Sequence, residues 1–370
     1  MTMTKWLWAA VAAVVGGTAL AESLESAIYF EEEDSYAFLV RHMPEKDRAV
    51  VGEDFLRETV ALAEEARRTA PWRAEITDEL FREYILPYSS IGEDPDAWRP
   101  EFRKRFWPLV KDCRTIGEAA AILNAKVFEI LDVRYDTRRD KADQSPFHSM
   151  RLHMASCTGL TILQVDAFRA CGIPARLAGC NWTPIPGNHS WLEYYENGAW
   201  HFFGDPEGDA PAPVDRSWFT AYAACADASE PRTRIYATRW SPKADGTRFW
   251  LTWRGEDRPS DVPADDVTAS YRRFRAALSD IRVGFVARDA EGRRTPRRFR
   301  LVESGSQKVV FEGETHDERH DMNDHLVVTR PEGAKLVVQT PCADGAWKSV
   351  GLVEFKAGDQ QLFTFGADEK

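Results

Sequence analysis

Three residues of this chain have side chains suited to nucleophilic catalysis, and each lies in an informative local context. Cys157 begins an apolar segment with helical spacing, which Gly172 and Pro174 then end. A cysteine at a helix N-terminus lies at the positive end of the helix dipole, which favours its reactive thiolate form. With His189 entering a predicted hairpin and Asp205 leaving it, the three types match a nucleophile, a base and a residue that orients the base.

The hairpin is predicted from the dipeptide Asn-Gly at 197–198, which stands between two aromatic-rich runs. A two-residue turn at this position pairs Glu196 with Ala199. The same register brings His189 and Asp205 to adjacent strands, although they are well separated in the sequence.

Side-chain alternation along these strands argues against a direct contact between His189 and Asp205. Strict alternation directs Asp205 to the opposite face of the sheet. A one-residue bulge at Gly204 would return it to the face of His189, because glycine in a strand often marks a bulge. We therefore predict that bulge; without it, Asp209 or Glu207 becomes the competing orienting residue.

At these residues the chain resembles the transglutaminase-like superfamily, whose members have a papain-like fold and a Cys-His-Asp triad. The resemblance spans residues 109–219 and is most specific at 156–159, 172–176, 187–191 and 198–200. The chain is also similar to a group of large secreted bacterial proteins with this domain, in which the sequence Gln-Ser-Pro-Phe, here 144–147, precedes the cysteine. It departs from the family in one respect, since the spacing from Trp200 to Asp205 is one residue longer than usual.

The resemblance implies Cys157 as the nucleophile, His189 as the base and later the acid, and Asp205 as the residue that holds the imidazole. Cys157 would attack a carboxamide carbonyl to form a thioester, which water or an amine then resolves. The implied partner is a peptide or protein substrate, and no cofactor or metal is implied.

Three further residues are candidates for contacts with the substrate. Gln144 would donate a second hydrogen bond to the oxyanion, beside the backbone N–H of Cys157; a polar loop residue is the alternative. Trp182 and Trp191 lie close to the histidine in sequence and would line a substrate groove, with a core position as the alternative for both.

Composition limits the classes of function. The chain has 370 residues, 44% of them hydrophobic, which is enough for a sizeable core and more than one domain. The formal net charge of −11 argues against a nucleic-acid partner. No Cys-x-x-Cys pair occurs, so a structural zinc site is not expected.

The first residues read as an export signal. Lys5 precedes an apolar run from 6 to 15, and Ala19-Leu20-Ala21 forms a small-x-small cleavage site. The run is shorter than the roughly 20 residues that span a bilayer. We expect cleavage after Ala21, a secreted or periplasmic protein, and no membrane insertion after cleavage.

The expected fold class is α+β, with a signal peptide at 1–21 and a helical segment at 22–108. A papain-like transglutaminase core, with a helix packed on an antiparallel sheet, is expected at 109–254, and a β-sandwich at 267–370. Patterns favour helices at 51–68, 77–85, 116–131 and 218–225 and further strands of the catalytic sheet at 235–240 and 248–253. The sequence leaves open the oligomeric state and the disulfide pairing of Cys113, Cys171, Cys180, Cys225 and Cys342.

One further cluster lies in the expected sandwich, where histidines and aspartates crowd the segment 316–325. Histidines at 316 and 320 would share a helix face and could bind a metal. Because the segment stands between two strands and is hydrophilic throughout, we expect an ordinary solvated loop.

The leading functional interpretation is a secreted cysteine enzyme that transfers or hydrolyses acyl groups of peptide or protein amides. A papain-like cysteine peptidase is the alternative within enzymes, because proteolysis proceeds through the same thioester. The alternative from another class is a non-catalytic binding or surface-assembly protein in which the triad is residual.

Overall fold

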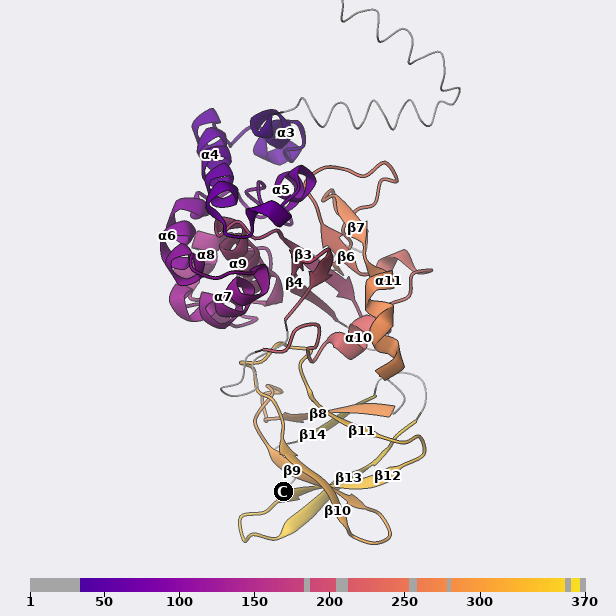
Figure 1. The fold of residues 1–370 in the computed structure, drawn as a ribbon. Helices are drawn as coiled ribbons and strands as arrows, with labels where there is room; N and C mark the ends of the chain where they lie inside the picture. The colour runs from indigo at the N-terminus through magenta and orange to yellow at the C-terminus, as the bar shows by residue number, and fades with distance from the viewer. Residues whose placement is uncertain are drawn as a thin grey trace, which may run out of the picture.

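The chain divides into an α+β part and a C-terminal β-sandwich (Figure 1). A computed structural model describes residues 34–182, 187–203, 212–252, 258–277, 281–356 and 361–366. The expected export signal at 1–21 lies outside the described residues.

Helices dominate the N-terminal half. They are α3 (Ser35–Arg41), α4 (Glu53–Thr69), α5 (Asp78–Tyr84), α6 (Trp98–Val110), α7 (Ile116–Leu131), α8 (Pro146–Leu152) and α9 (Cys157–Ala170). The predicted helix at 116–131 is confirmed because both of its ends carry strong signals. Thr115 accepts a hydrogen bond from the backbone of Glu118, and Asp132 ends the helix in the left-handed conformation at φ 53°.

The central sheet is antiparallel throughout, with strand order β5-β4-β3-β6-β7. Its strands are β3 (Ala175–Asn181), β4 (Asn188–Glu196), β5 (Ala199–His201), β6 (Tyr236–Thr238) and β7 (Ala264–Asp266). Helix α9 packs on β3 and β4, as Figure 1 shows. The predicted helix on an antiparallel sheet is therefore confirmed.

The predicted hairpin is also confirmed where the structure describes it. Glu196 pairs with Ala199, and both turn residues have positive φ, 51° at Asn197 and 83° at Gly198. Asparagine and glycine tolerate that conformation better than other residues, which explains the two-residue turn. The bulge predicted at Gly204 lies outside the described residues.

One predicted strand is wrong. At 248–253 only Arg248 makes a β-bridge, an isolated one with Pro263, and Trp253 lies outside the described residues. The fifth strand of the sheet is instead β7, which comes from the acidic stretch that follows. Apolar residues at 249 and 251 are buried without strand pairing, so burial alone produced the strand-like pattern.

The N-terminal helices share one hydrophobic core with the sheet. Trp72 donates its indole N–H to the carbonyl of Gly172, and Trp240 donates to that of Leu39. Glu83 of α5 is buried and accepts hydrogen bonds from Arg239 and from the backbone N–H groups of 240 and 241. The helical segment therefore extends the core of the sheet.

The C-terminal strands form two facing sheets around a second core. One sheet has the order β10 (Val309–Glu314), β9 (Arg298–Glu303), β12 (Lys335–Pro341), β13 (Trp347–Glu354); the other has β11 (Leu326–Arg330), β8 (Ile281–Arg288), β14 (Gln361–Gly366). Phe285 and Phe299 stack between the sheets with ring centres 4.9 Å apart. The predicted β-sandwich is confirmed.

Two short helices lie near the boundary between the two parts. α11 (Thr268–Tyr271) leads from the central sheet toward the sandwich, and α10 (Thr220–Ala224), which comes between β5 and β6 in the chain, packs against it. No helix in the described ranges is long and apolar enough to span a bilayer. The six cysteines, all of them within the described residues, form no disulfide.

Replacing Glu83 with alanine should lower the free energy of unfolding by about 3–5 kcal/mol, since it removes one partner of a buried ion pair. Urea denaturation measures this change. Glu79→Ala, at an exposed position of the same helix, serves as the control and should change stability by less than about 0.5 kcal/mol. Equal effects of the two substitutions would show that Glu83 does not anchor the helical segment.

Candidate active site

Cys157 is the first residue of α9 and follows the short strand β2 (Met154–Ala155) directly. β2 pairs in parallel with β1 (Arg134–Tyr135). Ser156 precedes the helix without making a side-chain cap, because its hydroxyl accepts a hydrogen bond from Arg139. The first N–H groups of α9 are thus left without a side-chain acceptor at Ser156, as expected for a cysteine at a helix N-terminus.

A close approach of backbone fixes the first turn of α9. A Cβ placed on Gly159 would lie 2.9 Å from the Cβ of Ala155. Only glycine therefore allows the helix start to pack against β2, and this contact sets the position of Cys157 next to the strand.

His189 lies on β4 opposite Cys180 of β3, and only 7% of its surface is exposed. Its ring lies against Trp182 and Trp191, whose ring centres are 6.1 Å and 5.9 Å away, and against Trp218 at 4.6 Å. These aromatic rings restrict the imidazole to a narrow range of orientations. Trp191 also lines the site cavity, whereas Trp182 is buried in the core behind it.

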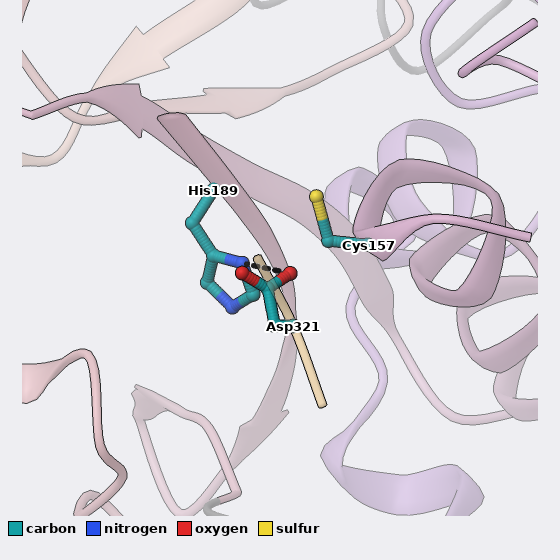
Figure 2. Close-up of side chains that lie close together, drawn as sticks. All are labelled: Cys157, His189 and Asp321. Atoms are coloured by element: carbon teal, nitrogen blue, oxygen red, sulfur yellow. Dashed lines mark ion pairs between the residues drawn. The ribbon is translucent and has the colours of Figure 1, made fainter. Parts of the chain in front are cut away.

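The carboxylate beside His189 comes from the sandwich. Oδ2 of Asp321 lies 3.3 Å from Nδ1 of His189, and both side chains are about 9% exposed. Figure 2 shows the dashed ion pair, with Cys157 beside it at the start of its helix. The sulfur of Cys157, a ring nitrogen of His189 and a carboxylate oxygen of Asp321 all lie within 4.8 Å of one another.

This contact is an ion pair rather than a well-aligned hydrogen bond. Neither Nδ1 of His189 nor Oδ2 of Asp321 has a hydrogen-bond partner of good geometry among the described residues. Charge attraction across 3.3 Å in a buried setting does not require such alignment. The three donor atoms also form the one group with metal-binding spacing that the described part of the chain contains.

The expectation of an ordinary solvated loop at 316–325 is wrong. This β10–β11 loop packs against the α+β part, where Asn323 donates to the carbonyl of Asn188 at 2.8 Å and the N–H of Met322 donates to the hydroxyl of Tyr135 at 2.6 Å. From within the sandwich, the buried Arg294 donates to the carbonyls of His320 and Asp321. The hydrophilic composition suggested a solvated loop, but the hydrogen bonds from Arg294 satisfy backbone carbonyls of the loop and let it pack.

Asp205, the predicted orienting residue, lies outside the described residues, as do the competitors Glu207 and Asp209. Sequence reasoning did not single out Asp321 for the triad. No local spacing pattern could have indicated it, because the contact joins two domains with separate hydrophobic cores. The only signal was the concentration of ionisable residues in one loop between strands.

Gln144 is fully buried next to β2. Its Nε2 donates to the carbonyl of Met154 at 3.2 Å, and its Oε1 has no partner among the described residues. It is not among the residues that line the cavity at Cys157. Its oxyanion role stays a prediction.

A cavity of about 570 Å³ opens at the three residues. Along α9 it is lined by Cys157, Leu160, Thr161 and Gln164, which share one face at helical spacing. The sandwich contributes Arg319 and Asp321 to the opposite wall. The cavity therefore lies between the two domains, and both supply its polar groups.

Residues 108–204 match the family model described as the transglutaminase-like superfamily. This segment is a transglutaminase-like domain. The match contains Cys157 and His189 but not Asp321, which comes from outside it. The search of curated proteins found no match.

Similar solved structures are remote. The "putative cysteine protease" of Cytophaga hutchinsonii is 20% identical over 29% of this chain and 35% of its own, with a TM-score of 0.24. The "putative protease" of Parabacteroides distasonis is 8% identical over 82% of this chain and 53% of its own, with a TM-score of 0.27. The chain thus spans about a third and half of these two proteins, and such low scores carry no argument about activity.

The charges around His189 favour its protonated form. Burial lowers the pKa of His189, but the Asp321 carboxylate and then Cys157 outweigh this and raise it to about 10. Burial also acts to raise the pKa of Asp321, yet His189 and the hydrogen bonds from Asn323 hold it below its usual value. The imidazolium and the carboxylate therefore stabilise each other.

A buried polar chain fixes the wall of the transglutaminase-like domain behind His189. Trp191 donates its N–H to the hydroxyl of Tyr271, which donates to Glu193, each at 2.6 Å. Arg176 completes the chain with an ion pair to Glu193 at 2.7 Å. Since Tyr271 belongs to α11 in the connection to the sandwich, this chain links the connection to the ring that packs on His189.

The ion pair between His189 and Asp321 should make stability depend on pH in a defined direction. Because folding raises the pKa of His189, the stabilisation is complete below the ordinary imidazole value near 6.5 and is lost as the pH rises through about 10. Asp321→Asn should therefore lower the melting temperature clearly at pH 6 and much less at pH 10.

Calorimetry at both pH values measures the difference, with Asp344→Asn, at an exposed position in another sandwich loop, as the control. If the difference in melting temperature between the wild type and Asp321→Asn does not decrease toward pH 10, the result would contradict the ion pair.

Proposed function

We propose that this protein is a cysteine acyltransferase or hydrolase that acts on peptide or protein amides. The observation that carries the proposal is the meeting of Cys157, His189 and Asp321 within 4.8 Å in one cavity. Helix position, buried imidazole and buried carboxylate are the parts that an activated thiol requires. The transglutaminase-like domain supplies two of them and the sandwich the third.

In the proposed reaction the proton of the Cys157 thiol passes to His189 before the attack, so the attacking group is a thiolate beside an imidazolium. The sulfur lone pair forms a bond with the carbonyl carbon of the amide, and the carbonyl π electrons move to the oxygen. When the oxyanion collapses, the C–N bond breaks and the leaving nitrogen takes the proton from His189, which leaves a thioester on Cys157. Water or an amine then attacks the thioester carbonyl and loses a proton to His189. The C–S bond breaks, which releases the acyl product and returns the electron pair to the sulfur of Cys157.

Asp321 acts in this scheme through the charge of His189. A carboxylate beside the imidazole stabilises the protonated form that accompanies both the thiolate and the tetrahedral intermediate. Because the side chain is buried, its charge is little screened by solvent. Docking of the sandwich on the transglutaminase-like domain is therefore part of the proposed site.

Transamidation, deamidation and proteolysis share the thioester and differ in the group that leaves and the group that enters. The proposal therefore concerns the acyl-enzyme on Cys157, and incubation of the protein with glutamine peptides, with and without a primary amine, distinguishes the products. Ammonia release with amine incorporation identifies transamidation, ammonia release alone identifies deamidation, and chain cleavage identifies proteolysis. Assays with EDTA exclude a contribution of metal bound at the three donors.

These products should be absent from Cys157→Ser, read by mass spectrometry. Products that persist in Cys157→Ser would contradict the proposal.

Alkylation of Cys157 by iodoacetamide tests the activated thiol without a known substrate. The wild-type rate should stay high well below the pH of about 8.5 at which a free thiol ionises, and His189→Ala should bring the profile back to that of a free thiol. Asp321→Asn should slow alkylation at pH 7 by about tenfold, equivalent to about 1.4 kcal/mol of barrier.

Asp205→Asn is the matched variant in the same assay. If Asp205→Asn slows alkylation less than Asp321→Asn does, the result would support Asp321 as the residue that orients His189. If it slows alkylation more, the orienting role would belong to Asp205. An inert Cys157 would exclude the catalytic function altogether.

A further inference from the structure

The oxyanion of the proposed intermediate needs hydrogen-bond donors, and the described donors are few. The start of α9 offers backbone N–H groups at Cys157. Gln144, the side-chain donor that the sequence suggests, uses its Nε2 on the carbonyl of Met154 and does not line the cavity. A second donor must therefore come from another cavity wall.

Tyr135 lies in a suitable place. It stands on β1 and pairs with Ala155 of β2, two residues before Cys157. The N–H of Asp136 donates to the carbonyl of Ala155 at 2.9 Å, which fixes this backbone next to the nucleophile. Tyr135 is half-buried and lines the same cavity as Cys157 and His189.

The hydroxyl hydrogen of Tyr135 is available as a hydrogen-bond donor. Its oxygen accepts the N–H of Met322 at 2.6 Å, and among the described residues no acceptor receives its own hydrogen. A tyrosine hydroxyl can accept and donate at the same time, so the contact with Met322 orients the group and leaves its hydrogen available. Met322 follows Asp321 directly, which places the hydroxyl beside the carboxylate loop.

The electrostatic surroundings keep this hydroxyl protonated. Burial, and after it the charges of Asp321 and Cys157, raise the pKa of Tyr135 well above its ordinary value. The group therefore stays a neutral donor across the whole pH range in which the thiol reacts.

We infer that Tyr135 donates the side-chain hydrogen bond that stabilises the oxyanion when Cys157 attacks a carbonyl. The inference rests on the proposed function and assigns a catalytic residue to it. As the sulfur–carbon bond forms, the carbonyl π electrons move to the oxygen, and the hydrogen of Tyr135 bonds to that oxygen without being transferred. When the intermediate collapses, the electrons return to the carbonyl and the leaving group departs.

Two reagents separate this role from a role in placing the loop. Alkylation by iodoacetamide displaces iodide and forms no oxyanion, whereas acylation by p-nitrophenyl acetate passes through one and releases p-nitrophenolate. Tyr135→Phe should reduce the acylation rate by about 100- to 1,000-fold, the effect typical for loss of one oxyanion donor. Its alkylation rate and alkylation pH profile should stay within about threefold of the wild type, because Arg294 and Asn323 still hold the loop that carries Asp321.

Asn323→Ala is the matched control, because it removes another contact between the same loop and the α+β part and also a hydrogen bond to the Asp321 carboxylate itself. It should lower alkylation and acylation together. If Tyr135→Phe also lowers both rates equally, the hydroxyl places the loop and the inference is wrong; if acylation is unchanged, another donor serves the oxyanion. A wild-type protein whose alkylation shows no dependence on His189 would instead refute the proposed function itself, an outcome that the same experiment identifies separately.

Discussion

The site depends on one buried ion pair between two domains, that of His189 with Asp321. Burying a carboxylate and an imidazolium is unfavourable unless each lies next to the other, so neither is stable in place without docking of the sandwich. The loop that carries Asp321 is held from both sides, by Arg294 within the sandwich and by Asn188 and Tyr135 across the boundary. Function and domain arrangement are therefore linked by the same contact.

The sandwich consequently has a role beyond that of an appended module. It supplies the charge next to His189, and it closes one wall of the cavity that begins at Cys157. On the other side of His189, the chain from Trp191 through Tyr271 to Glu193 ties the packing of the imidazole to the helix that leads into the sandwich. A shift of the sandwich would thus alter both the charge and the packing around one imidazole.

The sequence could predict the local parts of this structure and not the contact that joins them. The capping residues indicated the helix at 116–131, and Asn197 with Gly198 indicated the hairpin. Both signals depend only on contacts between residues close together in the sequence. Cys157 and His189, which local signals and family resemblance singled out, lie close together in the structure. Asp321 was missed because it reaches His189 only when two separate domains dock. The strand expected at 248–253 is absent because its apolar residues are buried without pairing to a neighbouring strand.

The most direct test of this account is the titration of the His189 imidazole by nitrogen NMR. The chain has eight histidines, and the signal that disappears in His189→Ala identifies this one. The account predicts an imidazolium that persists to a pH of about 10 in the wild type and titrates at markedly lower pH in Asp321→Asn. Titration near the ordinary value of 6.5 in the wild type, or an unchanged titration after the substitution, would contradict it.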